Sequence, residues 1–80
     1  MNIKILAFGI AKEICGDSTL RLEMPEGATA GDLQQLLIGQ YPRLGGLTSF
    51  LLAVNEEFAT TDTLISSGDE IAIIPPVSGG

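Results

Sequence analysis

The fold of this chain is decided by the stretch TAGDLQQLLIGQY, residues 29–41. Thr29 can cap the start of a helix, and Asp32 stands three positions later, which is a shortened form of the capping box. Gly39 weakens the last helical turn by ~1 kcal/mol relative to alanine, and Pro42 ends the helix. The apolar residues recur at helical spacings of three and four, so we expect one face of an amphipathic helix and, for the leucines, core positions: Leu33, Leu36, Leu37 and Tyr41.

Two strand patterns precede this helix. Residues 3–9 alternate between two sets that are both partly apolar, which is typical of a strand covered on both faces. Residues 10–15 predict one or two helical turns with Gly16 as the stop. Residues 19–24 alternate cleanly between apolar and polar side chains, which predicts a half-buried strand.

Three further strands follow the helix. Residues 43–49 predict an irregular loop, and residues 51–54 a short strand. Residues 55–57 predict a turn, after which Phe58 begins a return strand. Residues 70–74 form the last strand pattern and are apolar on both faces.

The order of elements is therefore β, β, α, β, short β, β. One helix of about three turns can cover one face of a single mixed sheet. The first and last long strands are the most apolar, so we expect them side by side in the middle of the sheet. The pattern predicts an α+β fold of the β-grasp (ubiquitin-like) type: a roll with a mixed four- to five-stranded sheet, one main helix and a short helix. Residues 1–80 are expected to form a single domain with a flexible tail from about 75–80.

The tail residues, Pro75-Pro76-Val77-Ser78-Gly79-Gly80, need an explanation other than folding. Glycine adds no packing and loses the most backbone freedom on ordering. A terminal Gly-Gly makes sense if the carboxylate is the working group, because residues without Cβ atoms can pass through a narrow channel. Two stiff prolines can hold the tail away from the body, and six extended residues reach at most about 20 Å. The alternative is an ordinary loose end or a cloning scar.

The composition disfavours several classes of function. A net charge of −6, from four basic and ten acidic residues, argues against nucleic-acid and anionic-membrane partners and favours a protein with a basic face. Without histidine the chain lacks the usual general base near neutral pH. A single cysteine allows no intrachain disulfide and no cysteine metal cluster, so we expect no metal site. The start lacks a signal-peptide pattern and no apolar run approaches ~20 residues, so we expect a cytoplasmic protein without a membrane span.

Four segments of the chain resemble a known family: residues 5–16, 52–55, 68–72 and 74–80. They are similar to the small subunit of molybdopterin synthase, a ubiquitin-like sulfur carrier of the MoaD type. The resemblance runs from end to end. Its specific part is the Pro-Pro-Val-x-Gly-Gly ending, whereas the Gly-Asp-Glu turn at residue 68 occurs in many proteins.

The resemblance implies a mechanism in which this chain supplies the reacting carboxylate and no catalytic side chain. An ATP-using, E1-like enzyme would adenylate the Gly80 carboxylate, and a sulfur donor would then leave a thiocarboxylate, 1-thioglycine, at Gly80. The tail, with Gly79 beside Gly80, would enter the large catalytic subunit of molybdopterin synthase and donate sulfur to a cyclic pterin phosphate precursor. The resemblance implies no bound cofactor, because ATP is used by the activating partner.

The resemblance also implies an apolar interface around the base of the tail. Its matching positions are Phe8, Phe58 and Ile74, and family members often carry an aromatic residue where Ile74 stands. From the residues alone, Phe8 and Phe58 suit a core or an interface equally. The complete set of expected partner-binding residues adds a basic position and the proximal tail: Phe8, Lys12, Phe58, Ile74, Pro75, Pro76 and Val77.

Alternatives remain open at this point. The chain could carry sulfur for another pathway, such as thiamine thiazole or cysteine, be a ubiquitin-like modifier joined through Gly80 to lysines, or be a binding domain with an inert tail. Cys15 could carry a persulfide or be a half-buried apolar residue. The acidic pair at residues 56–57 could contact a metal or a partner, or be a solvated turn. Asp69 and Glu70 could contact the adenylating enzyme, or Asp69 could close the turn after Gly68.

Overall fold

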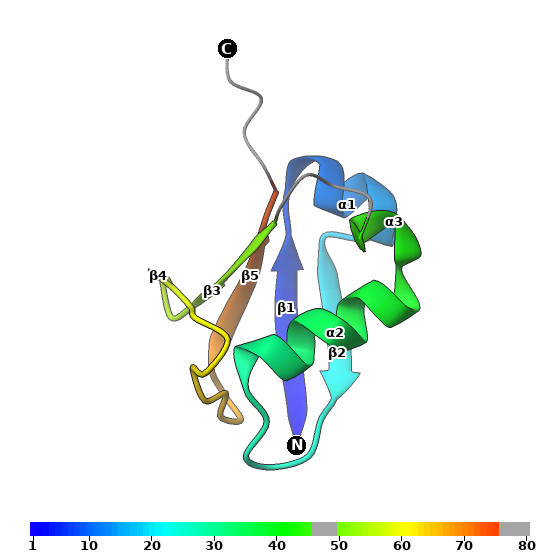
Figure 1. The fold of residues 1–80 in the computed structure, drawn as a ribbon. Coiled ribbons are helices and arrows are strands. Elements are labelled where there is room, and N and C mark those ends of the chain that lie inside the picture. Colours follow the sequence, from blue (N-terminus) through cyan, green and yellow to red (C-terminus); the bar gives the residue numbers. More distant parts are fainter. Residues whose placement is uncertain (46–49, 76–80) are drawn as a thin grey trace.

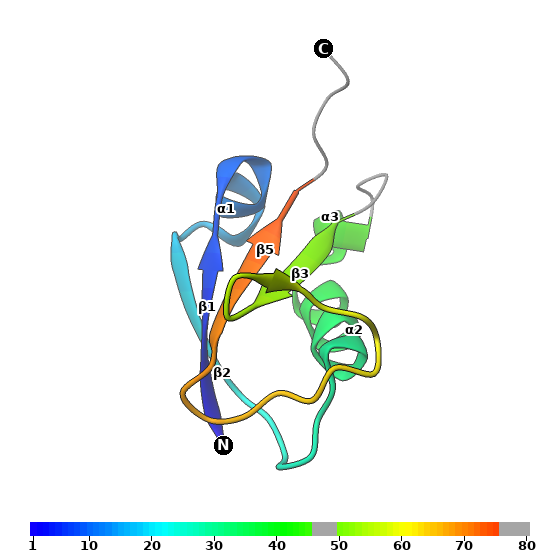
Figure 2. The same ribbon diagram turned by 90° about the vertical axis from the view of Figure 1, so that its left-hand side faces the viewer.

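The computed structural model describes residues 1–45 and 50–75. These residues form one five-stranded sheet with α2 packed across one of its faces (Figures 1 and 2). The elements are β1 (Asn2–Ala7), α1 (Gly9–Cys15), β2 (Thr19–Glu23), α2 (Ala30–Gln40), α3 (Pro42–Gly45), β3 (Leu51–Val54), β4 (Glu57–Phe58) and β5 (Glu70–Ile74).

The sheet has the strand order β2-β1-β5-β3-β4. The first and last long strands, β1 and β5, are parallel neighbours in the middle, with Ile5 opposite Ile71. The other three pairings are antiparallel. The central position of β1 and β5 is as predicted. The expectation that β1 is covered on both faces was wrong, because only the face toward α2 is buried and Leu6 on the other face is partly exposed.

The core lies between the sheet and the helices. Alternate residues of the strands turn toward it, among them Ile5, Ile71 and Ile73, which have no exposed surface. Leu33 and Leu37 of α2 cover them from the helix side and are also fully buried. Full burial of one such side chain is worth about 1.5–3 kcal/mol, so this layer dominates the stability of the fold.

The start of α2 has the predicted capping box. The backbone N–H of Asp32 donates to Thr29 Oγ1 at 3.2 Å, and the backbone N–H of Thr29 donates to Asp32 Oδ2 at 3.0 Å. The prediction that Leu36 belongs to the core was wrong in degree, because this side chain is only partly buried. At 3.6 residues per turn Leu36 lies about 100° around the helix from Leu37, on the flank of the buried face.

The prediction of an irregular loop over residues 43–49 was wrong at its beginning. Residues Pro42–Gly45 form the short helix α3, and the backbone N–H of Leu44 donates to Tyr41 O at 2.9 Å. Proline is favourable at the first position of a helix, and Leu44 has no exposed surface, so its burial anchors this turn. Residues 46–49 lie outside the described part of the chain.

Several predicted boundaries differ by one or two residues. β1 ends at Ala7 rather than Gly9, because the carbonyl of Phe8 accepts a hydrogen bond from Ala11 N and so begins α1. The β3–β4 turn consists of Asn55 and Glu56, both with positive φ, as in a two-residue hairpin turn of type I′. Glu57, predicted in the turn, is already part of β4. In residues 1–45 and 50–75, no helix is long and apolar enough to cross a membrane.

Candidate functional site

The carboxyl ends of the two central strands lie at the same edge of the sheet. Because β1 and β5 are parallel and Ala7 is opposite Ile73, Phe8 follows β1 where Ile74 ends β5. A Cβ atom on Gly9 would lie 3.6 Å from Cγ of Pro75, so the chain leaving β5 passes close to the start of α1. Figure 1 shows this end of β5 beside α1. The base of the C-terminal segment is therefore placed by the most buried strand pair of the fold.

The face of the sheet away from α2 carries a shallow depression of about 250 Å³ near this edge. Phe8 and Phe58 stand at its margin with half or more of their surface exposed, 50% and 70% respectively. We call the apolar part of its lining the apolar patch. The patch consists of Leu6, Phe8, Ala53, Phe58, Ala72 and Ile74, and Glu56 and Glu70 complete the lining of the depression.

The register of four strands explains the shape of the apolar patch. Ala72 of β5 is opposite both Leu6 of β1 and Ala53 of β3, and Ala53 is in turn opposite Phe58 of β4. Two alanines therefore make a low floor between larger side chains. Exposed aromatic side chains around such a floor are typical of a surface that receives an apolar group from another protein.

The structure brings together three of the predicted site residues: Phe8, Phe58 and Ile74. The exposure of Phe8 and Phe58 excludes the core position that their sequence had left open. Lys12 is exposed in the last turn of α1 and does not line this depression. Four predicted positions lie outside the described residues: Pro76, Val77, Gly79 and Gly80.

Three residues of the patch were not singled out from the sequence: Leu6, Ala53 and Ala72. Because side chains alternate between the two faces of a strand, Leu6 lies on the same face as Phe8, and the sequence pattern could have predicted its place in the patch. Nothing local marks the alanines. They matter only because the strand register sets them next to each other between larger residues.

Hydrogen bonds fasten the β3–β4 turn to the start of β5. The side chain of Asn55 donates to Asp69 Oδ1 at 3.0 Å and accepts from the backbone N–H of Glu70 at 3.0 Å. The backbone N–H of Ser66 donates to Asp69 Oδ2 at 2.8 Å. The bond from Ser66 and then that from Asn55 lower the pKa of Asp69 below its ordinary value. Asp69 thus closes the turn, and Glu56 is held at the margin of the apolar patch.

Two features of the described residues bear on catalytic and metal chemistry. Cys15 is partly buried, and burial raises the pKa of its thiol, which favours the unreactive neutral form. Within residues 1–45 and 50–75, no group of three or more acidic or cysteine side chains could hold a metal ion.

A model of the ThiS family matches residues 5–80 of the chain. The chain belongs to the ThiS family. A curated relative from Arabidopsis thaliana, the molybdopterin synthase sulfur carrier subunit, is 41% identical to it; the alignment covers 100% of this chain and 84% of that protein. The resemblance found in the sequence is thereby confirmed.

Solved structures place this ThiS-family chain in the same fold. SAMP1, the small archaeal modifier protein 1 of Haloferax volcanii, superposes with a TM-score of 0.85 at 29% identity and covers 100% of both chains. A chain from the complex of subunits 1 and 2 of the molybdopterin-converting factor of Helicobacter pylori superposes with a TM-score of 0.70 at 22% identity, again over 100% of both chains. The predicted ubiquitin-like β-grasp fold is confirmed, with α3 as a third, short helix.

Proposed function

We propose that this ThiS-family chain is the sulfur carrier subunit of a molybdopterin synthase and that Gly80 carries the sulfur as a thiocarboxylate. The supporting observation is the position of the apolar patch, which lies at the edge of the sheet where β5 delivers the C-terminal segment. A partner covering the patch receives that segment next to its own catalytic groups. The full-length similarity to the Arabidopsis carrier subunit supports molybdopterin synthase as the destination.

The proposed chemistry begins with activation of a poor electrophile. A Gly80 carboxylate oxygen attacks the α-phosphorus of ATP on an E1-like enzyme, and pyrophosphate leaves. A sulfur nucleophile then attacks the Gly80 carbonyl, AMP leaves, and a thiocarboxylate remains. On the large synthase subunit the thiocarboxylate sulfur attacks an electrophilic carbon of a cyclic pterin phosphate precursor. Water then cleaves the bond between this sulfur and the Gly80 carbonyl carbon, so the sulfur stays on the pterin and the Gly80 carboxylate is restored. The partners supply the bases and the phosphate-binding groups, which suits a chain without histidine and with a net charge of −6.

The remaining predicted residues have positioning roles in this proposal. Gly79 and Gly80 keep the end of the chain narrow, because neither carries a Cβ atom. Pro75, Pro76 and Val77 direct the segment away from β5, and prolines restrict the backbone available to it. The exposed Lys12 forms an ion pair with a partner near the same edge. In this proposal the chain itself binds no cofactor or metal and acts in the cytoplasm as one domain.

The mass of the C-terminal peptide tests the proposed function. The purified chain is incubated with the cognate E1-like enzyme, ATP and sulfide, and we expect one oxygen at Gly80 to be replaced by sulfur. The same result is expected for Cys15→Ser, because the partly buried thiol takes no part. A terminal carboxylate that stays unchanged while the enzyme activates a known carrier would refute the proposal.

Phe58→Ala tests the apolar patch as the docking surface. We expect about ten- to hundredfold weaker binding to the large synthase subunit, because an aromatic side chain buried at an interface commonly contributes 1.5–3 kcal/mol. Folding should be unaffected, since 70% of Phe58 is exposed in the free chain. Titration calorimetry measures the affinity.

Leu64→Ala is the matched control for Phe58→Ala. Leu64 is similarly exposed, at 66%, but lies outside the apolar patch, so its substitution should leave the affinity near that of the unchanged chain. Equal losses from the two substitutions would show that the patch has no special part in binding.

A second candidate function is a ubiquitin-like protein modifier. The observation that favours it is the structural and sequence similarity to the archaeal modifier SAMP1. Activation at Gly80 is the same in both cases, but a modifier ends in an isopeptide bond to a lysine. Conjugates of high mass that carry the C-terminal glycines on target lysines would favour this function. If the thiocarboxylated chain donated sulfur to a thiazole precursor and not to a pterin, the chain would be a sulfur carrier of another pathway.

A further inference from the structure

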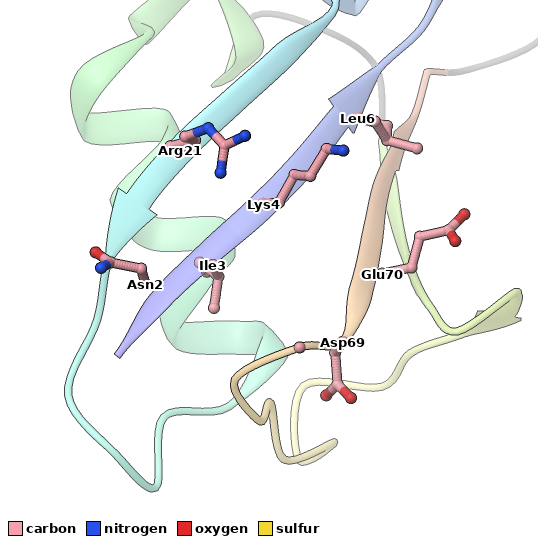
Figure 3. A pocket seen from close by; sticks show the side chains of 8 residues that line it. Asn2, Ile3, Lys4, Leu6, Arg21, Asp69 and Glu70 are labelled. Carbon is pink, nitrogen blue, oxygen red and sulfur yellow. The ribbon is translucent and has the colours of Figure 1, made fainter.

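A second and larger depression lies toward the other end of the same open sheet face (Figure 3). Its volume is about 560 Å³, and its walls come from β1, β2 and the start of β5. Four of the eight residues that line this depression are charged, whereas only two of the eight that line the smaller depression are charged. Its lining consists of Asn2, Ile3, Lys4, Leu6, Arg21, Gly68, Asp69 and Glu70.

Two cations stand side by side in this depression. Lys4 of β1 is the register partner of Arg21 of β2, and both side chains are exposed. Figure 3 shows them projecting from neighbouring strands on the same side of the sheet. Like charges directly opposite each other across a strand pair are destabilising. This pair, which holds two of the four basic residues of an acidic chain, therefore does not stabilise the pairing of β1 with β2.

The nearby acids neutralise the pair only in part. Glu70 is in register with Lys4, on the side of β1 away from Arg21. Asp69 lines the depression, but both of its oxygens accept hydrogen bonds from Asn55 and Ser66, and Figure 3 shows its carboxylate pointing away from the cations. Glu23 lies two residues beyond Arg21 on β2, opposite Asn2. The guanidinium of Arg21 thus remains open to a carboxylate from outside, and it can bind one with two parallel hydrogen bonds.

The two depressions adjoin each other. Leu6 and Glu70 line both of them, so the cation pair borders the apolar patch. The charges around the patch change sign across the sheet. The positive charges of Arg21 and Lys4 lie on β2 and β1. The negative charges of Glu70 and Glu56 lie on β5 and the β3–β4 turn. A charged margin of two signs around an apolar centre specifies how a partner is oriented.

We propose that Lys4 and Arg21 bind an acidic segment of the protein that covers the apolar patch, and that this contact sets the orientation of that protein across the sheet. The inference rests on the proposed function and names the large synthase subunit as the occupant. A nucleic acid does not fit, because a polyanion is repelled by a chain of net charge −6. Because salt screens exposed charges beyond about 10 Å, carboxylates of a bound protein can interact with Lys4 and Arg21 while its other charges are little affected by the rest of this chain.

The test uses the double variant Lys4→Glu, Arg21→Glu in the full chain. It moves the net charge from −6 to −10. If only long-range attraction to a basic partner mattered, the more acidic variant would associate faster and bind more tightly. A local contact with an acidic segment predicts the opposite, and we expect binding to the large subunit to weaken by about tenfold or more.

Arg43→Glu is the matched control. Arg43 is an exposed residue of α3, which packs with α2 rather than on the open sheet face, so this variant should bind as tightly as the unchanged chain or more tightly. A second double variant, Lys4→Gln, Arg21→Gln, removes the two charges without adding new ones and serves if the glutamates disturb the sheet. We expect its affinity for the large subunit to lie between those of the unchanged chain and the glutamate variant. Circular dichroism checks the fold of every variant.

The possible outcomes separate the inference from the proposed function. Weaker binding of both Lys4/Arg21 variants, with unchanged or tighter binding of Arg43→Glu, supports the acidic contact. Unchanged or tighter binding of the double variants overturns it, as does an equal loss for Arg43→Glu. If the variants overturn the inference while the unchanged chain binds the large subunit and is thiocarboxylated, the proposed function stands and only the inference fails. If the unchanged chain does neither, the proposed function fails, and the inference fails with it.

Discussion

Removal of Gly80 is expected to abolish sulfur transfer while the chain folds as before. The shortened chain still ends in a glycine carboxylate, but its reacting carbon is withdrawn by one residue, about 3.5 Å of extended chain. A misplacement of about 1 Å can already cost on the order of a hundredfold in rate, so we expect a loss of at least that size in both thiocarboxylate formation and pterin conversion. Single-turnover assays with the E1-like enzyme and the large subunit measure the two steps.

The stability of the truncated chain should be unchanged. The core of the described residues is complete without the end of the chain and draws its last member, Ile73, from β5. Ser78→Ala is the matched control, because it changes a neighbouring residue but keeps the terminal carboxylate in place. A further chain with one alanine added after Gly80 should be inactive for the same reason as the truncation. Normal pterin conversion by the truncated chain would refute the carrier mechanism.

Leu37→Ala is expected to cost about 2–5 kcal/mol of the free energy of unfolding. The side chain is fully buried under the sheet, and its removal leaves a cavity among residues that cannot close in completely. Domains of this kind have a total stability of only about 5–15 kcal/mol, so the variant should be close to the limit of folding. Urea unfolding followed by circular dichroism measures the change.

Leu36→Ala provides the comparison on the same helix. Leu36 is only partly buried, and its removal leaves a surface that water can occupy, so we expect a loss of about 1 kcal/mol. Both substitutions remove the same atoms from adjacent helical positions, and the helix propensity changes equally. If Leu36→Ala cost as much as Leu37→Ala, the helix would be rotated relative to the sheet.

Much of the fold follows from local patterns in the sequence. The capping box of Thr29 and Asp32 predicts the start of α2, because those two residues bond to each other's backbone whatever surrounds them. The apolar character of residues 70–74 on both faces predicts a central strand. The prediction of a carrier rather than an independent catalyst came from the Gly-Gly residues and the lack of histidine, and so from chemistry and not from packing.

Boundaries and degrees of burial did not follow from local patterns. α3 forms because Leu44 is buried against the rest of the core. The glycines next to Leu44 favour a loop in the sequence pattern, so this helix was not predicted. Leu36 has the same side chain and a similar spacing to Leu37, but the angle at which α2 meets the sheet buries one and leaves the other at the flank. The burial of Leu44 and the partial exposure of Leu36 therefore depend on how whole helices are placed against the sheet.

Apart from α3, the types and order of the elements follow from the amino-acid sequence, because periodicity and capping act over a few neighbouring residues. Which side chains make up the apolar patch depends on how the strands pair in the folded chain. Leu6, Ala72, Ala53 and Phe58 come from four strands and meet through their register, as do Lys4 and Arg21. Register is set by the burial of the opposite face against α2, since a slip of one residue would expose the core.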